Sequence, residues 1–221
     1  MALCVITGAN RGIGLELCRR LQARGDDVLA VCRTPSPDLE ALGVGIEAGI
    51  ELTDEACITS LRDRLDGQAI DLLIHNAGIL ESDTLETLDF ATIRRQFEVN
   101  ALAPLRLTQA LLGHLHAGSR LILMTSRMGS IGDNGSGGSY GYRMSKVALC
   151  MAGKSLAIDL RPRGIAVAIL HPGLVSTGMT GFTPSGISPA EAVTGLLARI
   201  DGLTLEESGT FWHANGKVLP W

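Results

Sequence analysis

Tyr142 and Lys146 stand four residues apart, and their side chains together have the chemistry of an acid–base catalyst. On a helix, residues at positions i and i+4 lie on the same face. An ammonium group beside a phenol stabilises the phenolate and lowers the phenol pKa from about 10 toward neutral pH. The pair is uncommon by chance, because the chain has 2 tyrosines and only three lysines. The spacing predicts a proton donor on one helix face, and a solvated face without a catalytic role is the alternative.

A glycine-rich segment follows the first apolar run and reads Thr7-Gly8-Ala9-Asn10-Arg11-Gly12-Ile13-Gly14. A first glycine permits a tight turn, a second lets the backbone approach a phosphate, and a third lets a helix pack closely on a strand. The amino end of the next helix offers free N–H groups and a positive dipole to a pyrophosphate. No lysine follows, so the segment is not a Walker loop. The pattern indicates a dinucleotide site, and a glycine-rich turn without a ligand is the alternative.

Short apolar runs alternate with helical patterns along the chain and supply the frame for these residues. Runs that are apolar without alternation are typical of strands buried on both faces, and the helices between them form right-handed crossovers. The predicted fold class is α/β, a single-domain Rossmann-type doubly wound parallel sheet of about seven strands with helices on both faces, over residues 1–221. The expected strands are 2–6, 28–32, 45–50, 72–75, 120–124, 165–170 and 210–212, and the expected helices are 14–24, 54–65, 88–115 and 142–160.

The composition excludes several classes of function. A net charge of −4 argues against nucleic acid or an anionic membrane as the main partner. No apolar run reaches the roughly 18 residues that a membrane helix needs, and the first residues lack the basic region of a signal peptide. The 5 cysteines are scattered without a Cys-x-x-Cys pair, and the 5 histidines form no metal pattern. We therefore expect a cytoplasmic protein without a metal.

Taken in order along the chain, the motifs resemble those of the short-chain dehydrogenase/reductase family, and the resemblance covers nearly the whole chain. The matching residues are Thr7 to Gly14, Asn76-Ala77-Gly78, Asn100, Ser126, Tyr142 with Lys146, and Pro172-Gly173. Three segments are similar in sequence to those of the C-factor and sniffer-like carbonyl reductase branch: Ser126 to Ile131, Tyr142 to Lys146 and Gly216 to Trp221.

That resemblance implies an NAD(P)-dependent oxidoreductase that transfers hydride between nicotinamide and a carbonyl or secondary alcohol. Its two long helices resemble the pair with which the family dimerises, so a homodimer is expected. The alternative is an NAD(P)-binding regulatory or signalling protein of the C-factor type, with weak or no turnover.

The resemblance also assigns catalytic roles to four residues. Tyr142 would be the acid in carbonyl reduction, and Lys146 would lower its pKa and hold the nicotinamide ribose. Ser126 would stabilise the substrate oxygen. Sixteen residues separate Ser126 from Tyr142, more than the family commonly shows, so Ser130 is a rival. Asn100 would join a proton relay through Lys146, or else it only breaks a helix that Pro104 also kinks.

Cofactor choice is determined at the end of the second strand, where a carboxylate suits NAD and an arginine suits the 2′-phosphate of NADP. Arg33 at this position and Arg11 in the glycine segment predict that NADP(H) is preferred over NAD(H), although both could be ordinary surface arginines. The expected cofactor contacts are Gly8, Asn10, Arg11, Gly12, Ile13, Gly14, Arg33, Glu51, Leu52, Asn76, Ala77, Gly78, Tyr142, Lys146, Pro172, Gly173, Val175 and Thr177. The expected substrate pocket contains Ser126, Met128, Leu174 and Met179.

Overall fold

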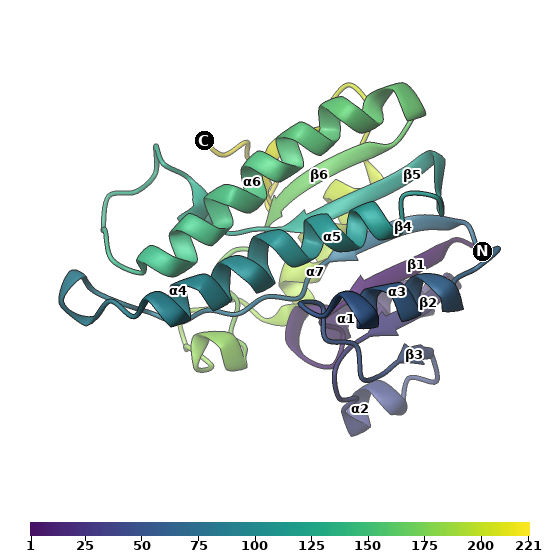
Figure 1. Ribbon diagram of the computed structural model, residues 1–221, viewed down its shortest axis with the longest axis horizontal. Helices are drawn as coiled ribbons and strands as arrows, with labels where there is room; N and C mark the ends of the chain where they lie inside the picture. Colours follow the sequence, from purple (N-terminus) through teal and green to yellow (C-terminus); the bar gives the residue numbers. More distant parts are fainter.

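The computed structural model describes residues 1–221 and contains one sheet of seven parallel strands (Figure 1). The strand order is β3-β2-β1-β4-β5-β6-β7, so the chain builds outward from β1 in one direction and then from β4 in the other. This order confirms the predicted doubly wound sheet. The strands are β1 (Leu3–Thr7), β2 (Asp27–Val31), β3 (Gly45–Glu47), β4 (Ile70–His75), β5 (Leu115–Met124), β6 (Ala166–His171) and β7 (Phe211–His213).

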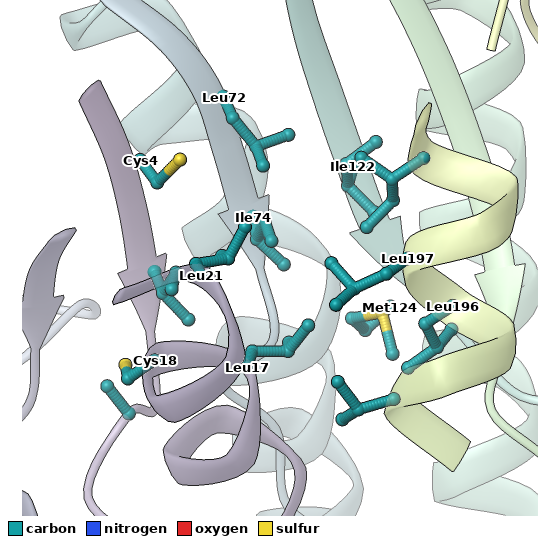
Figure 2. Close-up of a cluster of buried hydrophobic side chains, with 14 of the residues drawn as sticks. Cys4, Leu17, Cys18, Leu21, Leu72, Ile74, Ile122, Met124, Leu196 and Leu197 are labelled. Carbon is teal, nitrogen blue, oxygen red and sulfur yellow. The ribbon is translucent and has the colours of Figure 1, made fainter. Parts of the chain in front are cut away.

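Helices cover both faces of the sheet. On one face, α1 (Gly12–Ala23) and α7 (Pro189–Asp201) pack on the strands, and Figure 2 shows Leu17 of α1 and Leu197 of α7 in that apolar cluster. On the other face lie α3 (Glu55–Arg64), α5 (Ala103–Ala110) and α6 (Tyr140–Leu160). Two further helices are α2 (Pro37–Glu40) and α4 (Phe90–Phe97).

Apolar strands without alternation are explained by burial on both faces. Val5 and Ile6 are neighbours in β1, both are completely buried, and they belong to opposite clusters of the core. The same holds for Leu73 and Ile74 in β4. A central parallel strand therefore has no solvent side, and its sequence shows no period of two.

The long helix expected over 88–115 is divided. It consists of α4, a π-helical turn η2 (Glu98–Leu102) and α5, and β5 already begins at Leu115. Proline has no N–H to donate, so Pro104 removes one bond of the regular ladder and the turn before it is widened. The expected kink is present as this π turn, whereas the expected carboxyl end of the helix was wrong.

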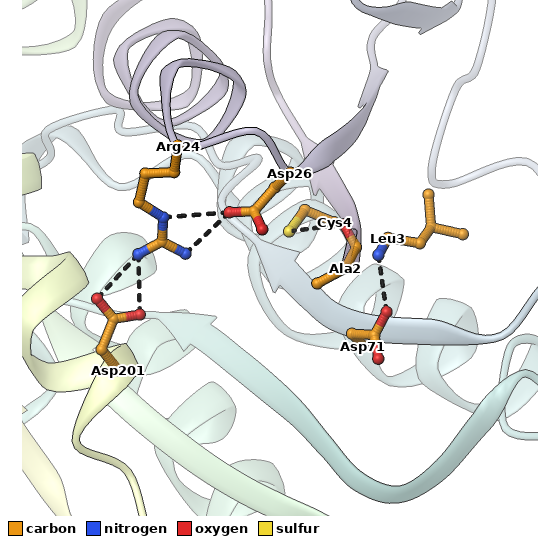
Figure 3. A network of polar contacts seen from close by, with 7 residues as sticks. All are labelled: Ala2, Leu3, Cys4, Arg24, Asp26, Asp71 and Asp201. Carbon is orange, nitrogen blue, oxygen red and sulfur yellow. Dashed lines mark hydrogen bonds and ion pairs between the residues drawn. The ribbon is translucent and has the colours of Figure 1, made fainter.

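The helix α7 was absent from the expected elements. Its start carries an ordinary signal, because the Ser188 hydroxyl accepts the Glu191 N–H and Pro189 occupies the first turn. At the opposite end of α7, the Arg24 guanidinium bonds both carboxylate oxygens of Asp201 and one oxygen of Asp26 (Figure 3). These groups are substantially exposed, so the pair contributes only about 0–1 kcal/mol. None of the helices is both long and apolar enough to cross a membrane.

Candidate active site

The glycine-rich turn joins β1 to α1, and two steric requirements account for its three glycines. Gly8 and Gly12 have φ values of +66° and +57°, in the left-handed region that favours glycine. A Cβ on Gly14 would lie 2.3 Å from the carbonyl oxygen of Gly8. Arg11 precedes the helix in extended conformation and no side chain caps it. The glycine turn therefore packs closely against the first turn of α1, and the N–H groups at the amino end of α1 remain free to bind an anion.

Asn76 connects this turn to the end of β4. Its Nδ2 donates to the carbonyl oxygens of Thr7 and Gly8, each at 3.1 Å. In return, the Thr7 hydroxyl accepts the N–H groups of Asn76 and Ala77. Four hydrogen bonds thus join the carboxyl ends of the neighbouring parallel strands β1 and β4.

A cleft of about 450 Å³ opens beside the carboxyl ends of β2 and β4. It contains Arg33 and Glu51, both expected cofactor contacts, with Arg33 Nη1 3.4 Å from Glu51 Oε2. Leu52, also expected there, packs instead against the apolar core. The remaining lining was not expected. It comes from the segment after β3, the loop after β4, α4 and η2: Thr53, Ile79, Glu81, Arg95, Glu98 and Val99.

Tyr142 and Lys146 lie in the first two turns of α6 and are 6% and 4% exposed. Lys146 Nζ is 5.8 Å from the centre of the Tyr142 ring, which confirms that the two side chains share a helix face. The ammonium donates a hydrogen bond to the carbonyl oxygen of Met124, at the end of β5, over 2.9 Å. Lys146 is therefore held between the helix and the sheet.

Burial dominates the electrostatics of this pair. It raises the pKa of Tyr142 to about 12, and the neighbouring Ser126 hydroxyl opposes the rise. Burial also lowers the pKa of Lys146 to about 8. In the chain by itself the pKa of Tyr142 therefore lies above its ordinary value, because the phenol loses water on burial. The lowering of this pKa by Lys146 stays a prediction, and the ammonium directs its hydrogen bond to Met124.

Ser126 and Ser130 have different surroundings. Ser126 follows the end of β5, is 9% exposed, neighbours Tyr142, and accepts the Met128 N–H at 3.1 Å. Ser130 is 1% exposed, and its hydroxyl accepts the Asp133 N–H. Ser126 therefore lies beside the phenol, whereas Ser130 stabilises the loop that contains Asp133.

Asn100 lies in the π turn η2 and is completely buried. Its amide accepts the Ile79 N–H and donates to the Ile79 carbonyl, each at 2.9 Å, and it also donates to the Ser145 hydroxyl. It makes no direct hydrogen bond with Lys146. Gly78 lies between the two, since a Cβ there would be 3.1 Å from Asn100 Oδ1 and 3.5 Å from Lys146 Nζ.

The segment after β6 returns over the glycine turn. A Cβ on Gly12 would lie 3.3 Å from Thr177 Cγ2, so Thr177 faces the glycine turn, and its contact with a cofactor stays a prediction. Val175 is buried and forms a β-bridge with Ile187, so its side chain contributes to packing.

Of the expected substrate contacts, Leu174 and Met179 are 52% and 44% exposed, and Met128 is half-buried. Asn10 accepts the Ser36 hydroxyl through its carbonyl oxygen.

Two buried polar residues near Tyr142 were missed from the sequence. Gln96 is completely buried in α4, four residues before Asn100, and Asp83 is 9% exposed in the loop after β4. The four-residue spacing of two amide side chains was an available signal for Gln96. Asp83 gave no local signal, because its partners are 57 and 58 residues further along the chain.

Comparisons with known proteins agree with this arrangement. The model of the short chain dehydrogenase family matches residues 2–187. The chain is 41% identical to 1-hydroxy-2-glutathionyl-2-methyl-3-butene dehydrogenase of Rhodococcus sp. (strain AD45), with 100% of both chains covered. It is 47% identical to the C-signal protein of Myxococcus xanthus over 69% of this chain and 93% of that protein.

Among solved structures, the NADPH-bound carbonyl reductase from chicken fatty liver superimposes with a TM-score of 0.90. It is 32% identical, and the match covers 100% of this chain and 98% of that one. The family match, the relatives and the seven-stranded sheet confirm the resemblance drawn from the motifs. The chain belongs to the short-chain dehydrogenase family.

Proposed function

We propose that the protein is an NADP(H)-dependent oxidoreductase that transfers hydride between nicotinamide and a carbonyl or secondary alcohol. The observation that carries the proposal is that Tyr142, Ser126 and Lys146 are buried side by side in a chain whose glycine turn leads into an uncapped helix. Binding alone would need the turn but not a buried phenol with a lysine and a serine beside it. The similarity to the chicken carbonyl reductase supports the same reaction class.

The glycine turn fits a dinucleotide pyrophosphate. Its positive φ values and the close approach of Gly14 to Gly8 leave backbone N–H groups accessible at the amino end of α1. The adenosine half would lie in the cleft between Arg33 and Ile79. Thr177, which faces Gly12, would hold the nicotinamide half.

In carbonyl reduction the chain's own residues handle the oxygen and the proton. The bound cofactor supplies the hydride to the carbonyl carbon. Ser126 donates a hydrogen bond to the substrate oxygen as negative charge develops there. Tyr142 transfers its phenolic proton to that oxygen, and the high pKa of the buried phenol keeps this proton in place at neutral pH. Lys146 is charged below about pH 8 and stabilises the phenolate that remains.

A preference for NADP(H) over NAD(H) follows from the charges at the adenosine end. Arg33 is 71% exposed and Arg11 is exposed, so both guanidiniums can turn toward a 2′-phosphate. Glu51 lies beside Arg33, on the third strand's loop rather than at the end of β2, where an NAD-specific protein places its carboxylate.

The experiment is NADPH oxidation measured with a panel of ketones, aldehydes and quinones. Oxidation of NADP⁺ with secondary alcohols tests the reverse direction, and the panel includes an alcohol that carries a glutathionyl group, since one relative is named for such a substrate. Turnover with any member supports the proposal. Tight NADPH binding with no turnover anywhere would favour the second candidate, a cofactor-binding signalling protein, which the similarity to the C-signal protein suggests.

A homodimer is the assembly that the surface of α6 favours. Met144, Met151 and Ile158 are exposed at seven-residue intervals along α6, so they form one apolar stripe on its outer face. Sedimentation of the wild type and of Met151→Glu tests the dimer, with a monomeric variant as the expected result. A cytoplasmic location agrees with the five cysteines, all of them free.

A further inference from the structure

The segment that follows Gly78 is held by two side-chain amides in the same way. Asn100 bonds both the N–H and the carbonyl of Ile79, each at 2.9 Å. Gln96 bonds both the N–H and the carbonyl of Glu81, at 3.0 and 3.2 Å. In a strand the N–H and the carbonyl of one residue face the same neighbour, so both amides act as a partner strand would.

The spacing explains why the two bonds repeat. Four residues of helix advance by about 6 Å, and two residues of extended chain by about 6.6 Å. Amides four apart on the helix therefore match residues two apart on an extended segment. Ile79 and Glu81 are the matched pair, and the next residue in this series is Asp83.

Asp83, the last residue of this series, bonds the helix that carries Tyr142. Its two carboxylate oxygens accept the N–H groups of Tyr140 and Gly141, and its carbonyl oxygen accepts the Ser139 N–H. Ser139, the residue before α6, has a φ of +48° and makes no side-chain cap. The amino end of α6 is thus capped from a different part of the chain.

Gln96 also touches the same end of α6. A Cβ on Gly141 would lie 2.6 Å from Gln96 Nε2 and 3.2 Å from Ile93 Cα, so the first turn of α6 packs directly on α4 at this point. The other side of the segment lines the cleft proposed for the cofactor, through Ile79 and Glu81. One short segment therefore connects that cleft to the first turn of α6, which carries Tyr142.

We propose that Gln96 and Asp83 are positioning residues for Tyr142: together they hold residues 79–83 so that α6 presents the phenol at a fixed place relative to the cofactor cleft. The proposal rests on the proposed function for its kinetic consequence. Asn100 holds the first residue of the segment and Gln96 the third, while Asp83, the fifth residue, bonds the amino end of α6. Neither Gln96 nor Asp83 touches the reacting atoms. Misplacement of a reacting group by about 1 Å can cost about 10²-fold in rate, so loss of either residue lowers kcat.

The test uses Gln96→Met, which keeps the shape of the side chain and removes both hydrogen bonds, with Gln109→Met on the exposed face of α5 as the matched control. The expected result is a fall in kcat of about tenfold or more in folded Gln96→Met, with KM and NADPH affinity within about twofold of wild type. Asp83→Asn retains one oxygen for the two N–H groups, so its loss of kcat is smaller than that of Asp83→Ala. Wild-type kcat in folded Gln96→Met or in Asp83→Ala would overturn the proposal.

A second measurement needs no turnover and so separates this proposal from the proposed function. The chain has 2 tyrosines, so fluorotyrosine labelling gives two fluorine NMR signals, which Tyr140→Phe assigns. The Tyr142 signal of Gln96→Met and of Asp83→Ala is expected to shift and broaden, while that of Gln109→Met is unchanged. An unshifted Tyr142 signal in both variants would overturn the proposal even if the wild type proves to be an active reductase. Absent turnover with a shifted signal would overturn only the reductase.

Discussion

Lys146 directs its ammonium to the carbonyl oxygen of Met124 and lies 5.8 Å from the centre of the Tyr142 ring. The lysine is thereby attached to the sheet while it shares a helix face with the phenol. Both groups are buried, so each is shifted toward its neutral form: the pKa of the phenol rises to about 12 and that of the ammonium falls to about 8. The phenol is a proton donor throughout the neutral range, which suits carbonyl reduction.

Carbonyl reduction is expected to slow as the pH rises through about 8. The folded pKa of Lys146 is depressed to about 8, so the ammonium is present below that pH and is lost above it, together with its stabilisation of phenolate. The measurement is the pH profile of kcat/KM with NADPH and one active carbonyl. In Lys146→Arg, whose guanidinium stays charged, this descending limb is expected to vanish. A limb at the same pH in the variant would assign it to another group.

Replacing Ser126 with alanine is expected to lower kcat by about 10²-fold, since a hydrogen bond to the developing oxyanion is lost. Ser130→Ala is the matched control. Its hydroxyl only accepts the Asp133 N–H, so the variant loses stability but keeps its turnover. Steady-state kinetics and thermal unfolding of both variants check this. The reverse order of effects would make Ser130 the substrate-binding serine.

Arg33 and Glu51 are expected to act in opposite directions on cofactor choice. Arg33→Ala removes a guanidinium proposed to bind the 2′-phosphate, so NADPH affinity falls by about tenfold while NADH affinity stays the same. Glu51→Gln removes the carboxylate that pairs with Arg33, so NADPH affinity rises. Fluorescence titration with both cofactors measures these changes. Equal losses for NADPH and NADH in Arg33→Ala would contradict a role at the 2′-phosphate.

His75 is expected to make the protein sensitive to acid. Its Nε2 bonds the Thr108 hydroxyl, which itself donates to the Pro104 carbonyl, so Nε2 carries a proton and donates to Thr108. Burial lowers its folded pKa to about 3, below the value of about 6.5 expected for the unfolded chain.

Because the unfolded state binds the extra proton first, the contribution of His75 to stability is intact above about pH 6.5 and falls by about 1.4 kcal/mol per pH unit below it, down to about pH 3. Burial also lowers the pKa of His171 to about 3, so that residue adds a second slope of the same sign. Denaturant unfolding at several pH values checks the slope. His75→Asn is expected to reduce the slope by about 1.4 kcal/mol per pH unit, and His116→Asn, at an exposed position, is the control. A wild-type stability that does not change over this range would refute the assignment.

The sequence was sufficient for features that depend on neighbouring residues. The glycine turn, the shared face of Tyr142 and Lys146, and the strands buried on both faces follow from spacing and apolar runs, and the structure has all three. The helix α7 has a similar local signal at Ser188 and Pro189 that was overlooked.

Other features depend on parts of the chain far apart in sequence. The pKa of Tyr142 is set by burial under several elements, and the bond from Lys146 to Met124 joins a helix to a strand. Asp83 caps a helix that begins 57 residues later. No local pattern contains these contacts, because they arise only when the sheet brings its carboxyl ends together.

The most direct test of the account is Tyr142→Phe, with Tyr140→Phe as the matched control two residues earlier on the same helix. The account predicts that Tyr142→Phe binds NADPH with wild-type affinity but reduces carbonyl substrates about 10²–10⁴-fold more slowly, because only the proton donor is removed. Tyr140, which is 38% exposed, can be replaced without loss of rate. A Tyr142→Phe protein that reduces its substrate at the wild-type rate would contradict the mechanism.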